Sequence, residues 1–293
     1  MGIVHTTSFA QGYRRYIGSL GDELNAKNGM NASTLVASVC LTPNDPGKTE
    51  RAVVKHFRFS DHGWANEYVA WTLAQQLGVV TAPRAALLIG RPSEVAADHG
   101  AELNYAVVHD PDPFVLWCTS AIEPTKPVQQ VLSRSWVRAV LNVANGQILA
   151  AFDAWIGNCD RAVNTLYWHV TGGGVVAIDH EKMVFAQDWA QHPPLDLDTV
   201  PADEEKAATF LLDALQKAKA STDSSTKRAA RRANQKMYEA SKGKHAAALS
   251  HCTNLIQEMV TPNFSARACQ NLLTFLERRA ADDSVNTRFG YMI

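Results

Sequence analysis

Three oxygen-bearing side chains suited to holding a metal and moving a proton lie close together near the middle of the chain. Asp160, Asn164 and Asp179 fall within one stretch of twenty residues. Mg²⁺ binds oxygen ligands, typically one or two carboxylates together with nucleotide phosphates. Kinase-type phosphoryl transfer uses one aspartate near the nucleophile and an Asn–Asp pair on the metal. Each residue alone could equally cap a turn, but the three together predict a Mg²⁺-dependent phosphotransferase.

A predicted hairpin explains how these residues would meet. The segments TLYWHV and VVAIDH flank a glycine-rich turn, TGGG, which favours antiparallel pairing. Pairing Val170 with Val175 places Leu166 opposite Asp179 and Asn164 beside Asp179 at the mouth of the hairpin. Asp160 would lie one short turn upstream.

A lysine and a glutamate earlier in the chain fit the same chemistry. Lys55 ends the segment A-V-V-K in a predicted strand, and Glu67 follows 12 residues later in a predicted helix. In the kinase pattern a lysine of this kind binds the α- and β-phosphates and pairs with a helical glutamate. A lone lysine in a strand is more often a solvated edge group, so the argument depends on both residues and on Asp160 to Asp179.

The first 125 residues predict a small sheet carrying one helix. The helix should begin after the capping residue Asp61 and end at Gly78. β-Branched and apolar runs around turn residues indicate the strands. The predicted strands are Ser33–Thr42, Arg51–Phe57, the ALLIG run after Pro83, Tyr105–His109 and Phe114–Thr119, and the predicted helix is Trp64–Leu77.

The remaining residues, 126–293, predict a larger and mainly helical part. The apolar run Ala139–Gly157 is interrupted by polar residues, which indicates a buried helix and not a membrane span. The pattern becomes helical again after Pro201. The fold expected is α/β (α+β) with two lobes: 1–125 as the small sheet-plus-helix lobe and 126–293 as the helical lobe.

Composition predicts a cytoplasmic globular protein. The 293 residues carry a net charge of −1, which gives no indication of nucleic acid or a membrane as partner. Five scattered cysteines argue against a disulfide framework. The segment Lys217–Lys244 is basic, and we expect a solvated helix or mobile loop there; a docking patch for an acidic partner is the alternative.

The string D-x-W-I-G-N-x-D-R, followed by Asn, a strand, a turn and I-D-H, resembles the HipA-like kinase family. That family belongs to the phosphatidylinositol-kinase-like branch of the protein kinase fold. The resemblance implies an ATP- and Mg-dependent kinase with a bilobal fold. It implies Asp160 as catalytic base, Arg161 as the arginine of the D-R pattern, and Asn164 and Asp179 as metal ligands.

The resemblance extends to the first lobe, through the pattern N-E…L-A…L-G around Glu67. It implies that Lys55 binds the ATP phosphates with Glu67 as its partner. It also implies a phosphate loop that precedes a strand and a hinge that meets the adenine through its backbone. The residues implied are Gly29, Asn31, Ser33 and Thr34 for the loop, and Leu116, Trp117, Cys118 and Thr119 for the hinge.

One departure from the pattern leaves an alternative open. Asn164 follows Asp160 by four residues, whereas kinase loops use five, and Ala162 replaces the usual histidine. A catalytically dead nucleotide- or partner-binding module is therefore the rival hypothesis; a phosphoester hydrolase is a third. The acceptor implied by the resemblance is a Ser or Thr of a protein, including Ser33 or Thr34 of this chain. A regulatory or antitoxin partner of a toxin–antitoxin pair is expected only at the level of the family.

Overall fold

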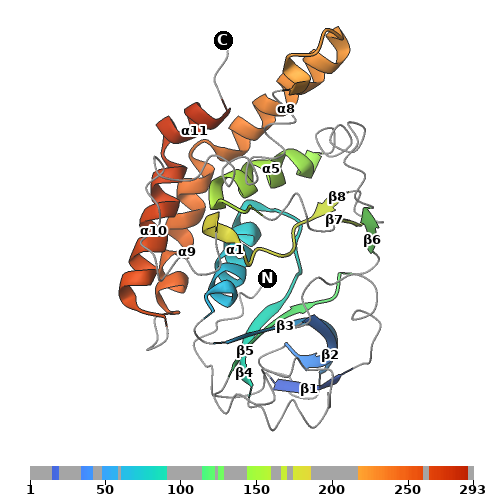
Figure 1. The fold of residues 1–293 in the computed structure, drawn as a ribbon, viewed down its shortest axis with the longest axis vertical. Helices are drawn as coiled ribbons and strands as arrows, with labels where there is room; N and C mark the ends of the chain where they lie inside the picture. The colour runs from blue at the N-terminus through green and yellow to red at the C-terminus, as the bar shows by residue number, and fades with distance from the viewer. Residues whose placement is uncertain are drawn as a thin grey trace. The chain divides into compact units, whose positions relative to one another are not determined.

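Figure 1 shows the fold of the chain in a computed structural model. The residues that the structure describes are 15–19, 34–41, 48–58, 61–90, 114–122, 125–128, 144–159, 166–169, 174–185, 217–259 and 264–289. They form a mixed α/β protein in which a small antiparallel sheet precedes a mostly helical remainder. The coarse fold class predicted from the sequence is therefore confirmed.

The chain separates into two compact units. The first comprises residues 1–68 and 82–122, and the second comprises residues 69–81 and 123–293. Helix α1 (Gly63–Leu77) is shared, because its residues as far as Tyr68 group with the first unit and its later residues with the second. The division at residue 122 falls just after the last strand of the first sheet.

The first unit is built on a five-stranded antiparallel sheet in the order β1-β2-β3-β5-β4. The predicted strands Ser33–Thr42 and Arg51–Phe57 form β2 and β3, which pair as an antiparallel hairpin from Thr34–Lys55 to Val39–Glu50. One face carries a continuous apolar cluster that includes Val39, Val54 and Cys118. The strands are β1 (Arg15–Ser19), β2 (Thr34–Cys40), β3 (Glu50–Arg58), β4 (Ala85–Gly90) and β5 (Phe114–Ser120).

Helix α1 begins and ends where the sequence predicts. The Asp61 carboxylate accepts a hydrogen bond from the Gly63 N–H at 3.0 Å, and Gly78 adopts a φ of +67° just beyond the last turn, a conformation that glycine adopts without strain. At the first position, a Cβ on Gly63 would lie 2.7 Å from the Phe57 ring. Glycine is therefore needed for the helix to start so close to β3.

The second unit contains a three-stranded antiparallel sheet, order β6-β7-β8, and a group of helices. Its strands are β6 (Thr125–Val128), β7 (Leu166–His169) and β8 (Gly174–Val176). Helix α5 (Ala144–Ile156) is the buried helix predicted from the apolar run. The later elements are η2 (Met183–Phe185), α8 (Ser224–Ser241), α9 (Lys244–Gln257), α10 (Ala266–Ala280) and α11 (Asp282–Phe289).

The β7–β8 hairpin forms, but its predicted register is wrong. Val175 pairs with Trp168, two residues from the predicted partner Val170. A shift of two residues keeps every side chain on the same face of the sheet, so the apolar pattern alone does not distinguish the two registers. β8 ends at Val176, and Asp179 has a φ of 62°, a conformation outside the range of a β-strand, so the predicted strand does not extend to Asp179.

No helix within the described ranges is both long and apolar enough to cross a membrane. All five cysteines are free thiols.

Candidate functional site

Lys55 lies on the face of the first sheet opposite to the apolar cluster. Side chains alternate along a strand, and Val54 belongs to the cluster while Lys55 does not. The register sets Lys55 level with Thr34 on β2 and with Trp117 on β5. Residues directly opposite each other in an antiparallel ladder share a face. Of the residues predicted to contact nucleotide, Lys55 and Trp117 thus share one face of the sheet, and Thr34 is level with them in the register of β2.

Helix α1 covers that same face and supplies the partner of Lys55. The ring of Tyr68 on α1 packs edge to face against the ring of Trp117 on β5, with the ring centroids 6.5 Å apart. Glu67 lies about one turn after the start of α1, and its Oε1 accepts a hydrogen bond from the Lys55 Nζ at 2.5 Å. The side chains are 13% and 3% exposed respectively, so the pair is largely removed from water. The Lys55–Glu67 pairing expected from the kinase pattern is present.

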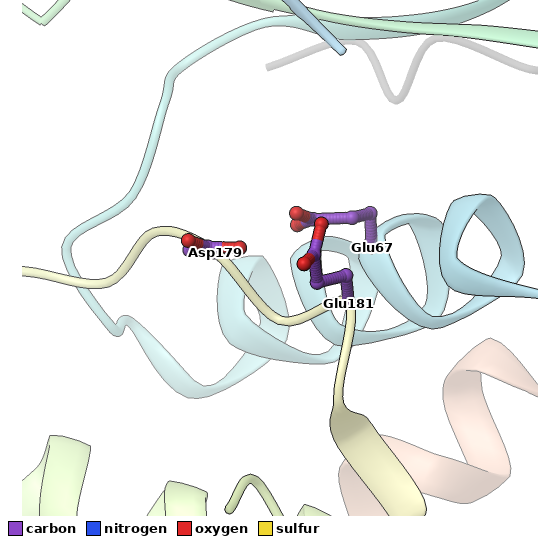
Figure 2. Close-up of side chains that lie close together, drawn as sticks. All are labelled: Glu67, Asp179 and Glu181. Carbon is purple, nitrogen blue, oxygen red and sulfur yellow. The ribbon is translucent and has the colours of Figure 1, made fainter. Parts of the chain in front are cut away.

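Glu67 also belongs to a cluster of three carboxylates with Asp179 and Glu181 (Figure 2). Each residue offers one oxygen atom, and these three atoms all lie within 4.8 Å of one another. Glu67 and Glu181 are buried, and Asp179 is half-buried. Figure 2 shows Asp179 and Glu181 on the loop that follows β8 and Glu67 on α1.

The chemistry of this cluster fits a hard divalent cation. All three donors are carboxylate oxygens, the ligands that Mg²⁺ and Mn²⁺ prefer, and no sulfur or imidazole of the kind that zinc favours is among them. Carboxylates taken out of water require compensating positive charge; Lys55 supplies one such charge to Glu67. Sequence reasoning included Asp179 as a metal ligand and missed Glu181. The sequence feature that could have indicated Glu181 is its position two residues after Asp179, in the string I-D-H-E.

The start of the loop that carries Asp179 is fixed by contacts within the second unit. The Asn145 side chain of α5 pairs with β8 as an extra strand would, donating to the Val175 carbonyl at 2.7 Å and accepting from the Val175 N–H at 3.2 Å. A Cβ on Gly174 would lie 2.5 Å from Asn145, so this pairing requires glycine there. Next along the chain, the Ala177 N–H donates to the Val80 carbonyl at 2.7 Å.

The segment that leads into Asp160 lies beside the same loop. The Cys159 thiol donates to the Lys182 carbonyl oxygen, with the sulfur 3.7 Å from that oxygen. Cys159 directly precedes Asp160, and Lys182 follows Asp179 by three residues. The two halves of the predicted motif therefore approach each other in space, as far as the described residues extend.

Two arginines hold the end of α5 immediately before this segment. The buried Arg279 donates through Nε to the Trp155 carbonyl at 2.8 Å and through Nη2 to the Ala154 carbonyl. Arg288 Nη1 donates to the same Ala154 carbonyl at 3.0 Å.

The backbone also closes this end of α5. The Asn158 N–H donates to the Asp153 carbonyl at 3.0 Å, and Gly157 has a φ of 65°, which together form a Schellman motif. These bonds satisfy the carbonyls of three of the last four residues of α5, and the cations lie at the negative end of the helix dipole.

Trp155, at the same end of α5, is held by a second set of contacts. The Trp155 Nε1 donates to the Leu276 carbonyl of α10 at 2.9 Å, and its ring stacks on His245 with centroids 4.3 Å apart. Burial, and next the charge of Arg288, lower the pKa of His245 to about 3. The imidazole is therefore neutral at pH 7.

Several predicted site residues lie outside the described part of the chain. This holds for the predicted base Asp160, for Arg161, for the predicted metal ligand Asn164, and for the loop residues Gly29, Asn31 and Ser33. Of the predicted phosphate loop, Thr34 is described as the first residue of β2. The predicted strand Tyr105–His109 is likewise not described.

The predicted hinge lies in an interior strand. β5 pairs with β3 on one edge and with β4 on the other, and both ladders include Leu116, Trp117, Cys118 and Thr119. Their backbone N–H and C=O groups face neighbouring strands, which argues against the predicted contact of this backbone with adenine. The reason is that a β-rich apolar run identifies a strand but does not say whether the strand has a free edge.

Comparisons of this chain with protein-family models, with curated proteins and with solved structures found no match.

Proposed function

We propose that this protein is an ATP- and Mg²⁺-dependent kinase of the HipA-like kind that transfers the γ-phosphate to a Ser or Thr hydroxyl of a protein. The observation that carries the proposal is the buried Lys55–Glu67 ion pair, whose glutamate also belongs to the carboxylate cluster with Asp179. In kinase-type phosphoryl transfer, a lysine paired with a glutamate contacts the phosphates, and an aspartate binds the metal.

The role of Lys55 in this proposal is electrostatic. Its ammonium neutralises charge on the α- and β-phosphates, while Glu67 keeps the lysine extended over the sheet face. A bound Mg²⁺ would be held by Asp179 and Glu181 and would supply further neutralisation of the phosphate charge. Such preorganised charge, together with positioning, accounts for most of the acceleration in phosphoryl transfer.

The proposed proton acceptor is Asp160. Its carboxylate orients the acceptor hydroxyl and takes the proton as the new O–P bond forms. The bond between the γ-phosphorus and the β–γ bridging oxygen breaks, and ADP leaves with that oxygen. The contact between Cys159 and the Lys182 carbonyl supports this role. It brings the residue just before Asp160 close to the loop that carries the proposed metal ligand Asp179.

The test is incubation of the purified protein with Mg²⁺ and γ-labelled ATP, followed by intact-mass analysis and by calorimetry of ATP–Mg²⁺ binding. Asp179→Asn is the site variant. Glu277→Gln, an exposed acid on α10, is the matched control for loss of one negative charge. We expect a phosphoryl group to be added to the wild type and the control, or to an added protein substrate, and not to Asp179→Asn.

The same two measurements separate the alternatives. ATP–Mg²⁺ binding without transfer to this chain or to any added protein would favour the inactive module, for which the short Asp160–Asn164 interval is the specific observation. Absence of ATP–Mg²⁺ binding would overturn the kinase proposal. Hydrolysis of phosphoesters without ATP would favour the hydrolase.

A further inference from the structure

Helix α8 lies within a strongly basic segment of a nearly neutral protein. Residues 217–244 contain nine Lys and Arg and two acidic residues, a net charge of +7. Because the whole chain carries −1, the remaining residues carry −8. The near-zero total therefore conceals a large separation of charge along the chain.

Five of these cations share one exposed face of α8. At 100° per residue, they occupy one half of the helix circumference, and the buried residues Ala230, Ala233 and Met237 occupy the other. They form two rows whose members are four residues, or about 6 Å, apart along the axis. The five cations, which we call the α8 basic face, are Lys227, Arg228, Arg231, Arg232 and Lys236, all exposed.

The protein does not neutralise the α8 basic face from within its described residues. No ion pair in that part of the chain includes any of the five cations. Of the two acidic residues of the segment, Asp223 caps the helix through Ser225 and Thr226. Glu239 lies on the same half of α8 as the cations, but it accepts a hydrogen bond from Gln235 at 2.8 Å and forms no ion pair with any of the five. Burial, and next the charge of Arg231, lower the pKa of Lys219, which is the repulsion expected between two neighbouring cations.

Local helix energetics do not account for this arrangement. Like charges four residues apart destabilise a helix by about 0.2–0.5 kcal/mol per pair. The face contains three such pairs: Lys227–Arg231, Arg228–Arg232 and Arg232–Lys236. A polyanion that neutralised them would remove the repulsion.

We infer that the α8 basic face binds the phosphate backbone of a nucleic-acid duplex. Phosphate contacts require only cations and hydroxyls, and they supply affinity without base reading. A protein partner is less suited, because protein interfaces have an apolar or aromatic centre, and no large apolar side chain of α8 is among its exposed residues. A membrane is less suited, because a surface helix inserts an apolar face, and that face of α8 is buried in the protein. This inference does not depend on the proposed kinase activity.

The test is fluorescence anisotropy of the full-length protein with a labelled random-sequence DNA duplex across a salt series. Engagement of the five cations predicts a plot of log K against log [salt] with a slope of about −4 to −5. The variant Arg231→Gln/Arg232→Gln should weaken binding about tenfold or more at low salt and reduce the slope by about 2. The matched control is Arg267→Gln/Arg278→Gln, which removes two exposed arginines from α10 and should change the slope little. Circular dichroism checks that both variants fold.

Two further probes test the choice of partner. Poly-glutamate and vesicles containing anionic lipid are compared with the duplex at the same salt concentration. Tighter binding of either probe than of the duplex would overturn the inference. Equal losses of DNA affinity in the α8 variant and the α10 control would also overturn it, because binding would then follow total charge and not this face.

Discussion

Lys55 and Glu67 meet at 2.5 Å across the boundary between a strand and a helix. The strand places the lysine on the sheet face that α1 covers, and the capped start of α1 sets the glutamate one turn into the helix. Both side chains are mostly withdrawn from water, so the charge of each is compensated in part by the other. The position of the pair is thus a consequence of the fold of the first unit.

Glu67→Gln should destabilise the protein and weaken nucleotide binding. The substitution removes the negative charge of Glu67 from beside the largely buried Lys55, which should cost about 1–3 kcal/mol. Urea unfolding measures the stability, and calorimetry with ATP–Mg²⁺ measures the affinity.

Glu50→Gln provides the control for this prediction. It breaks the Arg84–Glu50 ion pair, in which Arg84 is 43% exposed, and should cost about 0.5 kcal/mol because water screens that pair. A loss of equal size in the two variants would mean that burial of the Lys55–Glu67 pair has no special weight.

Glu181→Gln should weaken divalent-metal binding with little change in the fold. It removes one of three carboxylate oxygens from the cluster. We expect the affinity for Mn²⁺, used as a paramagnetic substitute for Mg²⁺, to fall about tenfold or more, since even residues that only support a metal ligand have effects of that size. Electron paramagnetic resonance titration measures free Mn²⁺, and Glu277→Gln serves as the control. Unchanged Mn²⁺ affinity would remove Glu181 from the metal site.

Arg288→Ala should loosen the end of α5 that leads into Asp160. It removes the hydrogen bonds to the Ala154 and Arg279 carbonyls, at a cost of about 1–3 kcal/mol. Hydrogen exchange should accelerate at the Asn158 amide, which closes the helix end. Arg267→Ala, an exposed arginine of α10, should change neither property. Identical exchange at Asn158 in the wild type and Arg288→Ala would show that Arg279 alone holds this helix end.

His245 should make stability depend on pH on the acidic side. Its pKa is lowered from 6.5 to about 3 in the folded protein, so between these values the unfolded chain binds a proton that the folded protein does not. The contribution to stability is fully present above pH 6.5 and is lost as pH falls towards 3, by about 1.4 kcal/mol per pH unit.

His245→Phe isolates this effect, because it keeps an aromatic ring against Trp155 and removes the titrating group. Chemical denaturation at pH 7, 6 and 5 should show a shallower loss of stability for the variant than for the wild type. Parallel losses would assign the acid sensitivity to other groups.

Local patterns predicted the elements of the fold well. The β2–β3 hairpin, the limits of α1 and the buried helix α5 all follow from β-branched runs, a capping aspartate, a terminating glycine and apolar periodicity. These signals are short-range, because they reflect backbone preferences and burial over a few neighbouring residues. The pairing of Lys55 with Glu67 was expected because a strand lysine followed by a helical glutamate matches the kinase pattern.

By itself, then, the sequence determined the type of each of these elements and the residues with chemistry on β3, α1 and the loop after β8. Only the tertiary structure decided how strands pair and which distant residues meet. The β7–β8 register differs by two residues because such a shift preserves both faces of the sheet. The interior position of Leu116–Thr119 depends on β4, which comes from another part of the chain. Glu181 joined the carboxylate cluster, and Arg279 and Arg288 reached the end of α5, because long-range packing brings together residues whose types and spacing carry no local signal.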